Sequence, residues 1–274
     1  MECLLQWVPL LILMVISGAL GGALAGMLGV GGGIVYVPAL DLLFSLVGVE
    51  SDVSMHAAVA TSLAIIVPTS ISSSLAHHKR DSVDLDIVRL WGPTILLGSI
   101  IGVVAASQLK GSILSLGFGM MTFFVAMNML LPNQKIIFFK RISSPSLGIA
   151  VPFGLGGFSS MLGIGGGTFS VPILTMMDRS IHRAVGTAAA FGLLISLPGA
   201  LSFVISGWGD DRMPIASLGY INLIALVFMA PVTVLAASMG AAEAHRLEQR
   251  QLRLLFGFCL FLISIRMIFK TFLS

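Results

Sequence analysis

Long apolar runs separated by short polar stretches cover almost the whole chain. A helix needs roughly 17 to 25 apolar residues to cross the ~30 Å hydrocarbon core of a bilayer, and the alternating pattern of barrel strands is not seen in this sequence. The pattern predicts an all-α integral membrane protein with about 8–10 transmembrane segments, some of them broken or half-length. The apolar segments are 8–28, 33–49, 55–76, 91–108, 112–131, 146–164, 168–178, 184–206, 216–242 and 252–273.

Two copies of a glycine-rich string interrupt these segments at matching places. Gly26 to Leu40 reads GMLGVGGGIVYVPAL, and Ser160 to Leu174, 134 positions later, reads SMLGIGGGTFSVPIL. Backbone groups left unpaired in lipid cost several kcal/mol each, so such breaks survive where protein or a polar cavity covers them. In transporters, paired breaks of this kind indicate the substrate site.

The duplication extends beyond the glycine strings. His56 to Thr61 reads HAAVAT and His182 to Thr187 reads HRAVGT, 126 positions later, and further blocks match at an offset of 138. Matched blocks in the same order are typical of a tandem repeat. The sequence therefore predicts a first membrane repeat over 1–140 and a second over 141–274, joined in one integrated transmembrane domain.

The charged residues indicate how the two halves are oriented. With five segments in each half and the N-terminus outside, acidic turns at Glu50/Asp52 and Asp210/Asp211 fall outside, and most basic residues fall inside, as the positive-inside rule requires. An odd number of segments per half reverses the second half. We therefore expect two inverted repeats of about five helical segments each. The inside loops hold Lys79, Arg80, Arg89, Lys135, Lys140, Arg141, Arg179, Arg183, Arg246, Arg250 and Arg253.

Candidate substrate-binding residues lie in the glycine strings or carry a hydroxyl one to two turns into a following helix. Glycines let the backbone unwind, and the amide groups and helix N-termini after a break offer positive partial charge to an anion. The strings lack the Lys-Ser/Thr of a nucleotide phosphate loop. The candidates are Gly29, Gly31, Gly32, Gly33, Thr61, Ser62, Gly163, Gly165, Gly166, Gly167 and Thr187.

Other small or hydroxyl residues have a simpler interpretation. Close helix packing explains the small-residue spacing of Gly18, Gly22 and Gly26, which Gly98 and Gly102 repeat. The serine-rich stretch 70–74 is interpreted as a hydrated or packing surface.

Three titratable residues are candidates for gating or coupling. His56 and His182 occupy matching positions in the two halves, and Asp41 lies inside an apolar segment near its outer end. Helix capping for the histidines and snorkelling for Asp41 remain open alternatives. Cys3 and Cys259 lack metal-type spacing and are interpreted as packing residues. The sequence predicts no metal and no cofactor.

Composition sets the class of partner. Hydrophobic residues make up 57% of the chain and charged residues 10%, and the mean hydropathy is +1.03, values typical of a protein whose partner is the lipid bilayer. The net charge of +3 is explained by topology, so nucleic acid is not an expected partner. The oligomeric state is open, with a homodimer as one option.

The doubled Gly-x-Gly-Gly-Gly-x3-Val-Pro string, each copy followed by His-x-Ala-Val-Gly/Ala-Thr, closely resembles the TauE/SafE family of exporters. The resemblance spans nearly the whole chain. It implies a multi-pass carrier in the inner membrane, with sulfite or organosulfonates as the small anions carried. It also places the glycine segments 29–33 and 163–167 and the threonines Thr61 and Thr187 nearest the site.

The leading functional hypothesis is a secondary transporter that exports small sulfur-containing anions by alternating access at the interface of the two repeats. An anion channel, or a carrier of other small organic anions, is the alternative. An intramembrane enzyme is disfavoured because no HExxH, Ser–His or paired-carboxylate pattern falls within the apolar segments.

Overall fold

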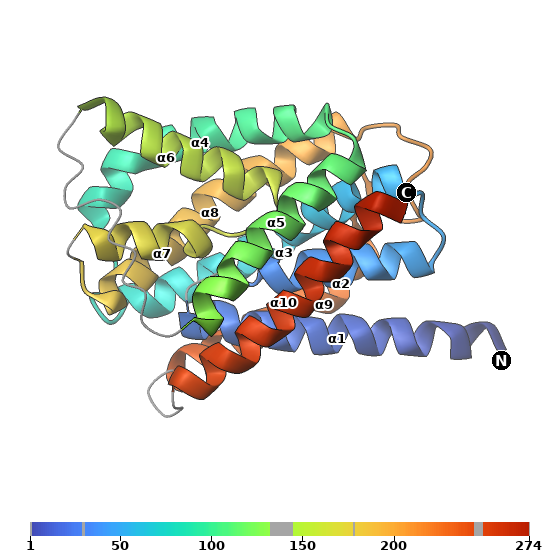
Figure 1. The fold of residues 1–274 in the computed structure, drawn as a ribbon, viewed down its shortest axis with the longest axis horizontal. Helices are drawn as coiled ribbons and strands as arrows, with labels where there is room; N and C mark the ends of the chain where they lie inside the picture. Colours follow the sequence, from blue (N-terminus) through green and yellow to red (C-terminus); the bar gives the residue numbers. More distant parts are fainter. Residues whose placement is uncertain (1, 29–30, 132–144, 178, 244–248, 274) are drawn as a thin grey trace.

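Ten helices and one short hairpin make up the part of the chain that the computed structural model describes, residues 2–28, 31–131, 145–177, 179–243 and 249–273. The prediction of an all-α membrane protein is confirmed (Figure 1). The helices are α1 (Glu2–Leu28), α2 (Gly33–Leu46), α3 (Ser51–His78), α4 (Leu85–Ser107), α5 (Gly111–Leu130), α6 (Pro145–Met161), α7 (Gly167–Met176), α8 (Ile181–Ser206), α9 (Leu223–Glu243) and α10 (Gln249–Leu273), with β1 (Ser217–Leu218) antiparallel to β2 (Ile221–Asn222).

The helices that follow the glycine breaks are too short to cross a bilayer. With 14 residues in α2 and 10 in α7, a rise of about 1.5 Å per residue gives roughly 21 and 15 Å. By contrast, α1, α3, α4, α8 and α9 contain stretches long and apolar enough to span. The expected half-length segments are therefore α2 and α7.

One predicted segment begins in the wrong place. The apolar run from residue 216 was expected to be helical from its start, but residues 217–222 form the hairpin and α9 begins at Leu223. Ala216 and Gly219 have φ values of 62° and 55°, which a helix does not accommodate.

Helix contacts repeat between the two halves. The strongest pairs include α1 with α9 and α4 with α6, then α3 with α9 and α4 with α8, and then α2 with α3 and α7 with α8. When each helix is replaced by the one five places away in the chain, the pair α1–α9 becomes α6–α4, α3–α9 becomes α8–α4, and α2–α3 becomes α7–α8. We call helices related in this way counterparts.

The correspondence reaches single residues. A Cβ built on Gly22 of α1 would lie 2.8 Å from the Cα of Thr233, and one built on Gly156 of α6 would lie 3.0 Å from the Cα of Ile95. These two contacts are related by the same offsets, 134 and 138, that relate the sequence blocks. The packing interpretation of the glycine stripe is confirmed for the described members with close helix contacts, which are Gly18, Gly22, Gly98 and Gly102.

The counterparts α3 and α8 run antiparallel. Gly186, near the start of α8, lies against His77 at the end of α3. At the other end, the ring of His56 is 5.4 Å from that of Tyr220, and Tyr220 is 6.3 Å from Phe203 near the end of α8.

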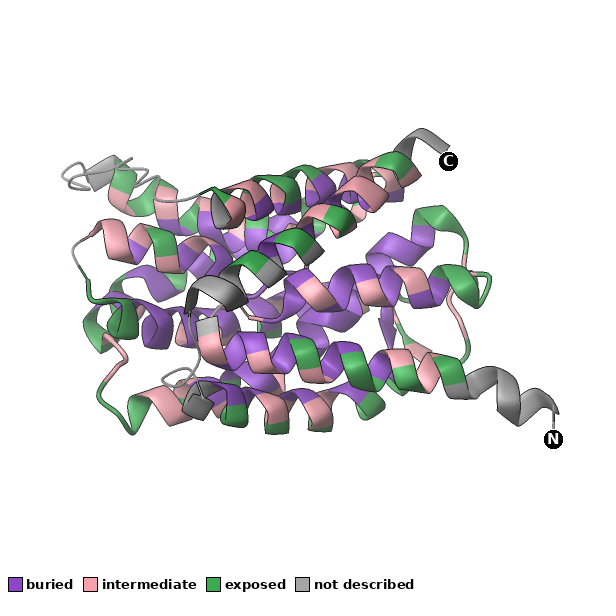
Figure 2. Ribbon diagram, turned by 60° about the horizontal axis from the view of Figure 1, so that its bottom comes forward, coloured by how far each residue is buried: buried purple, intermediate pink, exposed green. Residues whose placement is uncertain are grey.

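The bundle has two ends that differ in the Lys and Arg of their connections: Lys79, Arg80, Arg179 and Arg183 lie at one, and Arg212 at the other. The helix α3, the most buried of the candidate spans, connects the two ends. Buried residues gather in the middle of the bundle (Figure 2). The basic end is defined here by the connections at 77–86 and 177–183, which are joined by an ion pair of 3.2 Å between Arg179 and Asp84. The acidic end is defined by the connections at 47–52 and 207–222, which carry Glu50, Asp52, Asp210 and Asp211.

Candidate functional site

The two glycine breaks meet inside the bundle. A Cβ on Gly31 would lie 2.7 Å from the Cα of Gly165, and a Cβ on Gly165 would lie 2.9 Å from the Cα of Gly31. These two glycines are counterparts at the offset of 134. A Cβ on Gly33 would likewise collide with the carbonyl oxygen of Gly163. The backbones approach this closely because neither break carries a side chain at the contact.

Left-handed backbone at the breaks turns the chain into the next helix. Gly31, Gly32 and Gly163 have φ values of 81°, 64° and 66°, which glycine adopts without steric cost. Gly32 precedes α2, and Gly166 precedes α7. The first N–H groups of a helix have no partner within it and carry a positive partial charge. Both half-length helices therefore begin at the junction of the breaks.

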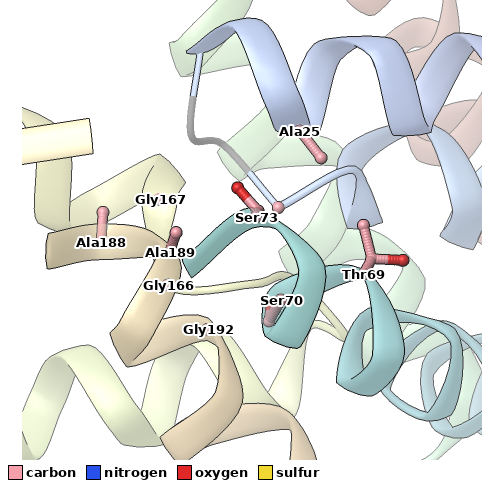
Figure 3. Close-up of a pocket in the computed structure, with 10 residues that line it drawn as sticks. Ala25, Thr69, Ser70, Ser73, Gly166, Gly167, Ala188, Ala189 and Gly192 are labelled. Carbon is pink, nitrogen blue, oxygen red and sulfur yellow. The ribbon is translucent and has the colours of Figure 1, made fainter. Parts of the chain in front are cut away.

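A narrow cleft lies beside this junction, between α3 and α8 (Figure 3). Its enclosed space is about 10 Å³, room for a single water-sized group. Every residue lining it is a glycine, alanine, serine or threonine, and none of these ten described residues is charged. They are Ala25, Gly31, Thr69, Ser70, Ser73, Gly166, Gly167, Ala188, Ala189 and Gly192.

Two serines of α3 supply hydroxyl groups to the cleft. Ser73 is 4% exposed, and its hydroxyl has no hydrogen-bond partner. A Cβ on Gly192 of α8 would lie 2.5 Å from Ser70 Oγ, so the glycine keeps this part of the cleft open. Buried hydroxyls without a partner cost stability. Such a group at a cleft wall is available to a ligand.

The cleft is one-sided. Its residues lie in the halves of α3 and α8 nearer the basic end, where His77 approaches Gly186. In the matching half nearer the acidic end, three of the six lining residues of α3 and α8 are replaced by larger, fully buried ones. At the offset of 126, the replacements are Leu63 for Ala189, Ile66 for Gly192 and Ile195 for Thr69.

The candidate threonines join helices of opposite halves. Thr61 Oγ1 accepts a hydrogen bond of 3.0 Å from the N–H of Asn222, and Thr187 Oγ1 accepts one of 2.9 Å from the N–H of Asp84. The side chains of the same Asn and Asp cap the first turns of α9 and α4. The two contacts are counterparts. Neither threonine lines the cleft.

The other candidates fall in three places. Ser62 donates a hydrogen bond of 2.8 Å to the carbonyl oxygen of Gly163 and so supports the second break. Gly166 and Gly167 line the cleft with Gly31, while Gly32, Gly33, Gly163 and Gly165 form the surrounding junction. Gly29 lies outside the described residues.

The two histidines lie at opposite ends of the bundle. His56 Nδ1 is 2.8 Å from the carbonyl oxygen of Asp52, and Nε2 is 3.2 Å from that of Ala106, at the acidic end. A neutral imidazole donates one of these hydrogen bonds, whereas an imidazolium donates both. His182 lies in the first turn of α8 at the basic end and is exposed. Neither histidine reaches the cleft.

Ionic contacts organise the connection at the acidic end. Arg212 donates hydrogen bonds of 2.9 and 2.7 Å to the Asp210 carboxylate and lowers the pKa of this carboxyl to about 2. The hydroxyl of Tyr220 also donates to Asp210, at 3.3 Å, and burial raises the pKa of this tyrosine. Because the ring of Tyr220 contacts His56, this connection covers the acidic end of α3.

Ser70 and Ser73 line the cleft although the sequence did not make them candidates for binding. They belong to the serine-rich stretch 70–74 interpreted there as a hydrated or packing surface. Their spacing of three places both on one face of α3, but a sequence does not show which helix that face meets. The cleft appears only once α8 presents Ala188 and Gly192 to it.

Comparisons with known proteins agree with this membrane architecture. Residues 14–267 match the family described as Sulfite exporter TauE/SafE. The chain is 35% identical to a "Probable membrane transporter protein" of Haemophilus influenzae, over 95% of this chain and 98% of the relative. It is 26% identical to "Probable membrane transporter protein YunE" of Bacillus subtilis, over 96% of this chain and 99% of the relative. No solved structure matches the chain.

Proposed function

Because this chain belongs to the sulfite exporter TauE/SafE family of membrane transporters, we propose that it exports small sulfur-containing anions, such as sulfite or organosulfonates, as a secondary transporter. The cleft at the meeting glycine breaks is the proposed anion site. The single observation that carries this proposal is the contact between Gly31 and Gly165, which brings two half-helix N-termini and the cleft together.

The lining of the cleft suits a small oxyanion. Helix N-termini and backbone amides stabilise negative charge, and the Ser73 hydroxyl has a free donor. The lining residues are all small, so a ligand that widens the cleft can approach the backbone closely. Recognition by dipoles rather than by a fixed cation lets an anion leave as readily as it enters.

The helix pairings support alternating access. We propose that residues 1–140 and 141–274 are inverted repeats and that the halves exchange conformations during transport. In the present arrangement the half of α3 and α8 nearer the basic end carries the cleft, while Leu63 and Ile66 fill the matching place nearer the acidic end. If the two halves exchanged these arrangements, the cleft nearer the basic end would close and a matching cleft would open nearer the acidic end.

The distribution of Lys and Arg between the two ends supports a direction. Under the positive-inside rule the basic end faces the cytoplasm. The cleft then opens toward the cytoplasm, where an exporter in the inner membrane collects its substrate. We propose that the acidic end is the exit.

The test is flux through the purified protein in liposomes, handled without oxygen so that sulfite is not oxidised. Radiolabelled sulfite is presented with unlabelled sulfite, sulfate, thiosulfate, sulfoacetate or acetate on the opposite side. Saturable counterflow driven by sulfite or sulfoacetate is expected. Unitary currents in a planar bilayer would identify a channel instead, and a lack of flux for every anion would overturn the proposal.

A further inference from the structure

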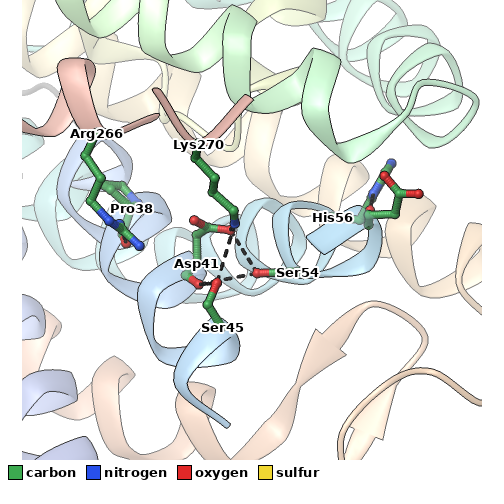
Figure 4. Close-up of polar contacts among 8 residues, drawn as sticks. Pro38, Asp41, Ser45, Ser54, His56, Arg266 and Lys270 are labelled. Atoms are coloured by element: carbon green, nitrogen blue, oxygen red, sulfur yellow. Dashed lines mark hydrogen bonds and ion pairs between the residues drawn. The ribbon is translucent and has the colours of Figure 1, made fainter. Parts of the chain in front are cut away.

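A buried carboxylate binds the last helix near the acidic end. Asp41 of α2 is fully buried, and its Oδ1 accepts a hydrogen bond of 2.7 Å from Lys270 Nζ of α10 and one of 2.8 Å from Ser54 Oγ of α3 (Figure 4). Lys270 Nζ also lies 3.4 Å from Ser45 Oγ. Three helices therefore meet at one carboxylate.

The carboxylate depends on this ion pair. Asp41 Oδ2 is buried and has no hydrogen-bond partner, so Lys270 and Ser54 provide the compensation through the other oxygen. Removing one member of a buried ion pair leaves an uncompensated charge and is strongly destabilising. The side chain of Lys270 is 19% exposed, whereas that of Asp41 is fully buried. The Asp41–Lys270 ion pair is strong while it is formed, and the partly exposed side chain of Lys270 can be solvated once the pair breaks.

The ion pair joins two helices that otherwise have little contact. Most of the contacts of α10 are with α5, and it touches α2 only sparsely. The nearby Arg266 reaches the carbonyl oxygen of Pro38 at 3.5 Å, a weak contact. Asp41 and Lys270 therefore provide the strongest described polar link between α2 and α10.

The link has no counterpart among the residues of the other half that the structure describes. The residue matching Asp41 is Thr175, whose hydroxyl bonds carbonyl oxygens of its own helix. The residue matching Lys270 in the sequence is Pro132. The charge pair therefore secures only the acidic end, opposite the half that carries the cleft. A contact on one side alone breaks the equivalence of the two halves.

We propose that the Asp41–Lys270 ion pair is a latch that keeps the acidic end closed while the cleft is open toward the basic end. The latch rests on the alternating access proposed above, because it must break before α2 can separate from α10 and release the anion. It sets the balance between the two arrangements and so the fraction of molecules ready to accept substrate from the basic end.

Spin-label distances test the latch directly. Labels on Leu46→Cys and Phe269→Cys, both exposed positions, report the separation of α2 and α10 in nanodiscs, in a chain carrying Cys3→Ser and Cys259→Ser. The parent chain should show one dominant short distance. Asp41→Asn/Lys270→Met, which leaves no buried charge unpaired, should raise the long-distance population about tenfold. An unchanged distribution would overturn the latch.

Two further variants keep the test informative. Arg266→Met removes a neighbouring cation from the same helix and should leave the distribution as in the parent chain; an equal shift there would refute a specific latch. Ser54→Ala removes one donor but neither charge, so it should produce a smaller shift in the same direction even if the double variant fails to fold. No shift in a folded Ser54→Ala chain would count against the latch.

Flux measured alongside separates the two proposals. If the parent chain transports sulfite and the double variant shows the same label distances as the parent chain, the proposed function stands and the latch is refuted. If the label distances shift in the double variant but the parent chain transports none of the anions, the latch stands and the proposed function is refuted.

Discussion

Gly31 and Gly165 touch through their backbones, although 134 residues separate them. Each lies in the break before a half-length helix, and several helix pairings recur between counterparts on the two sides of this contact. The contact explains why the glycine string occurs twice. Either string alone would leave an interrupted helix, whereas together they place two helix N-termini at one junction.

A single added methyl group at the junction should stop transport. The Cβ of Gly165→Ala would lie 2.9 Å from the Cα of Gly31, so backbone must shift, and overpacking of this kind costs about 1–3 kcal/mol. We expect at least a tenfold loss of sulfite flux in liposomes with normal insertion. Gly148→Ala is the matched control, since nothing lies within 4 Å of its Cβ. Equal flux from the two variants would contradict the account.

Ser73→Ala should weaken binding without weakening the fold. The hydroxyl has no partner within the protein, so no internal hydrogen bond is lost. A hydrogen bond to a charged group contributes about 1.5–3 kcal/mol, so KM for sulfite should rise at least tenfold. Thermal unfolding in detergent should be unchanged.

The control for that substitution is Ser74→Ala. The Ser74 hydroxyl bonds the carbonyl oxygen of Ile71 on its own helix, and KM should remain as in the parent chain. A normal KM in Ser73→Ala would remove this serine from the site.

Thr187→Val should lower the thermal stability of the protein and leave its affinity for sulfite unchanged. The substitution keeps the shape but deprives the N–H of Asp84 of its acceptor, and an unsatisfied buried donor costs about 1–3 kcal/mol. Thr61→Val should behave alike through Asn222. Thermal unfolding and KM measured on the same preparations separate the roles. A raised KM with unchanged thermal stability would instead place these threonines at the anion.

Ala189→Leu should close the cleft. This substitution installs the residue that its counterpart, Leu63, uses to fill the matching place nearer the acidic end. Binding of radiolabelled sulfite to purified protein should be lost. Ala105→Leu, on an exposed face of α4, adds the same volume and should bind normally. Retained binding in Ala189→Leu would show that the anion site lies elsewhere.

Much of the architecture could be predicted from local sequence. Apolar runs long enough to span and paired glycine strings depend on neighbouring residues, so they indicate helices and breaks directly. The residues at which helices begin and end were harder to predict from the sequence, as the hairpin at 217–222 shows. Its turn is set by backbone conformations at Ala216 and Gly219 that an apolar run conceals.

The side-chain roles depended on distant partners. Thr61 was grouped with the glycines because a threonine follows the glycine string in both halves, yet its hydroxyl accepts a hydrogen bond from Asn222. That contact arises only from the packing of α9 on α3. Asp41 was recognisable as an oddity in an apolar segment. Its partner Lys270 lies 229 positions away, and the matching position in the first half of the sequence is Pro132, so the matched blocks gave no indication of the pair.

The central claim is that the anion binds where the two glycine breaks meet. Selenite, the selenium analogue of sulfite, makes this measurable by anomalous diffraction at the selenium edge, using crystals of the chain with Cys3→Ser and Cys259→Ser. The account predicts an anomalous peak in the cleft, within hydrogen-bond distance of Ser73 Oγ and next to the first turn of α7. A peak elsewhere in the bundle, with none in the cleft, would contradict it.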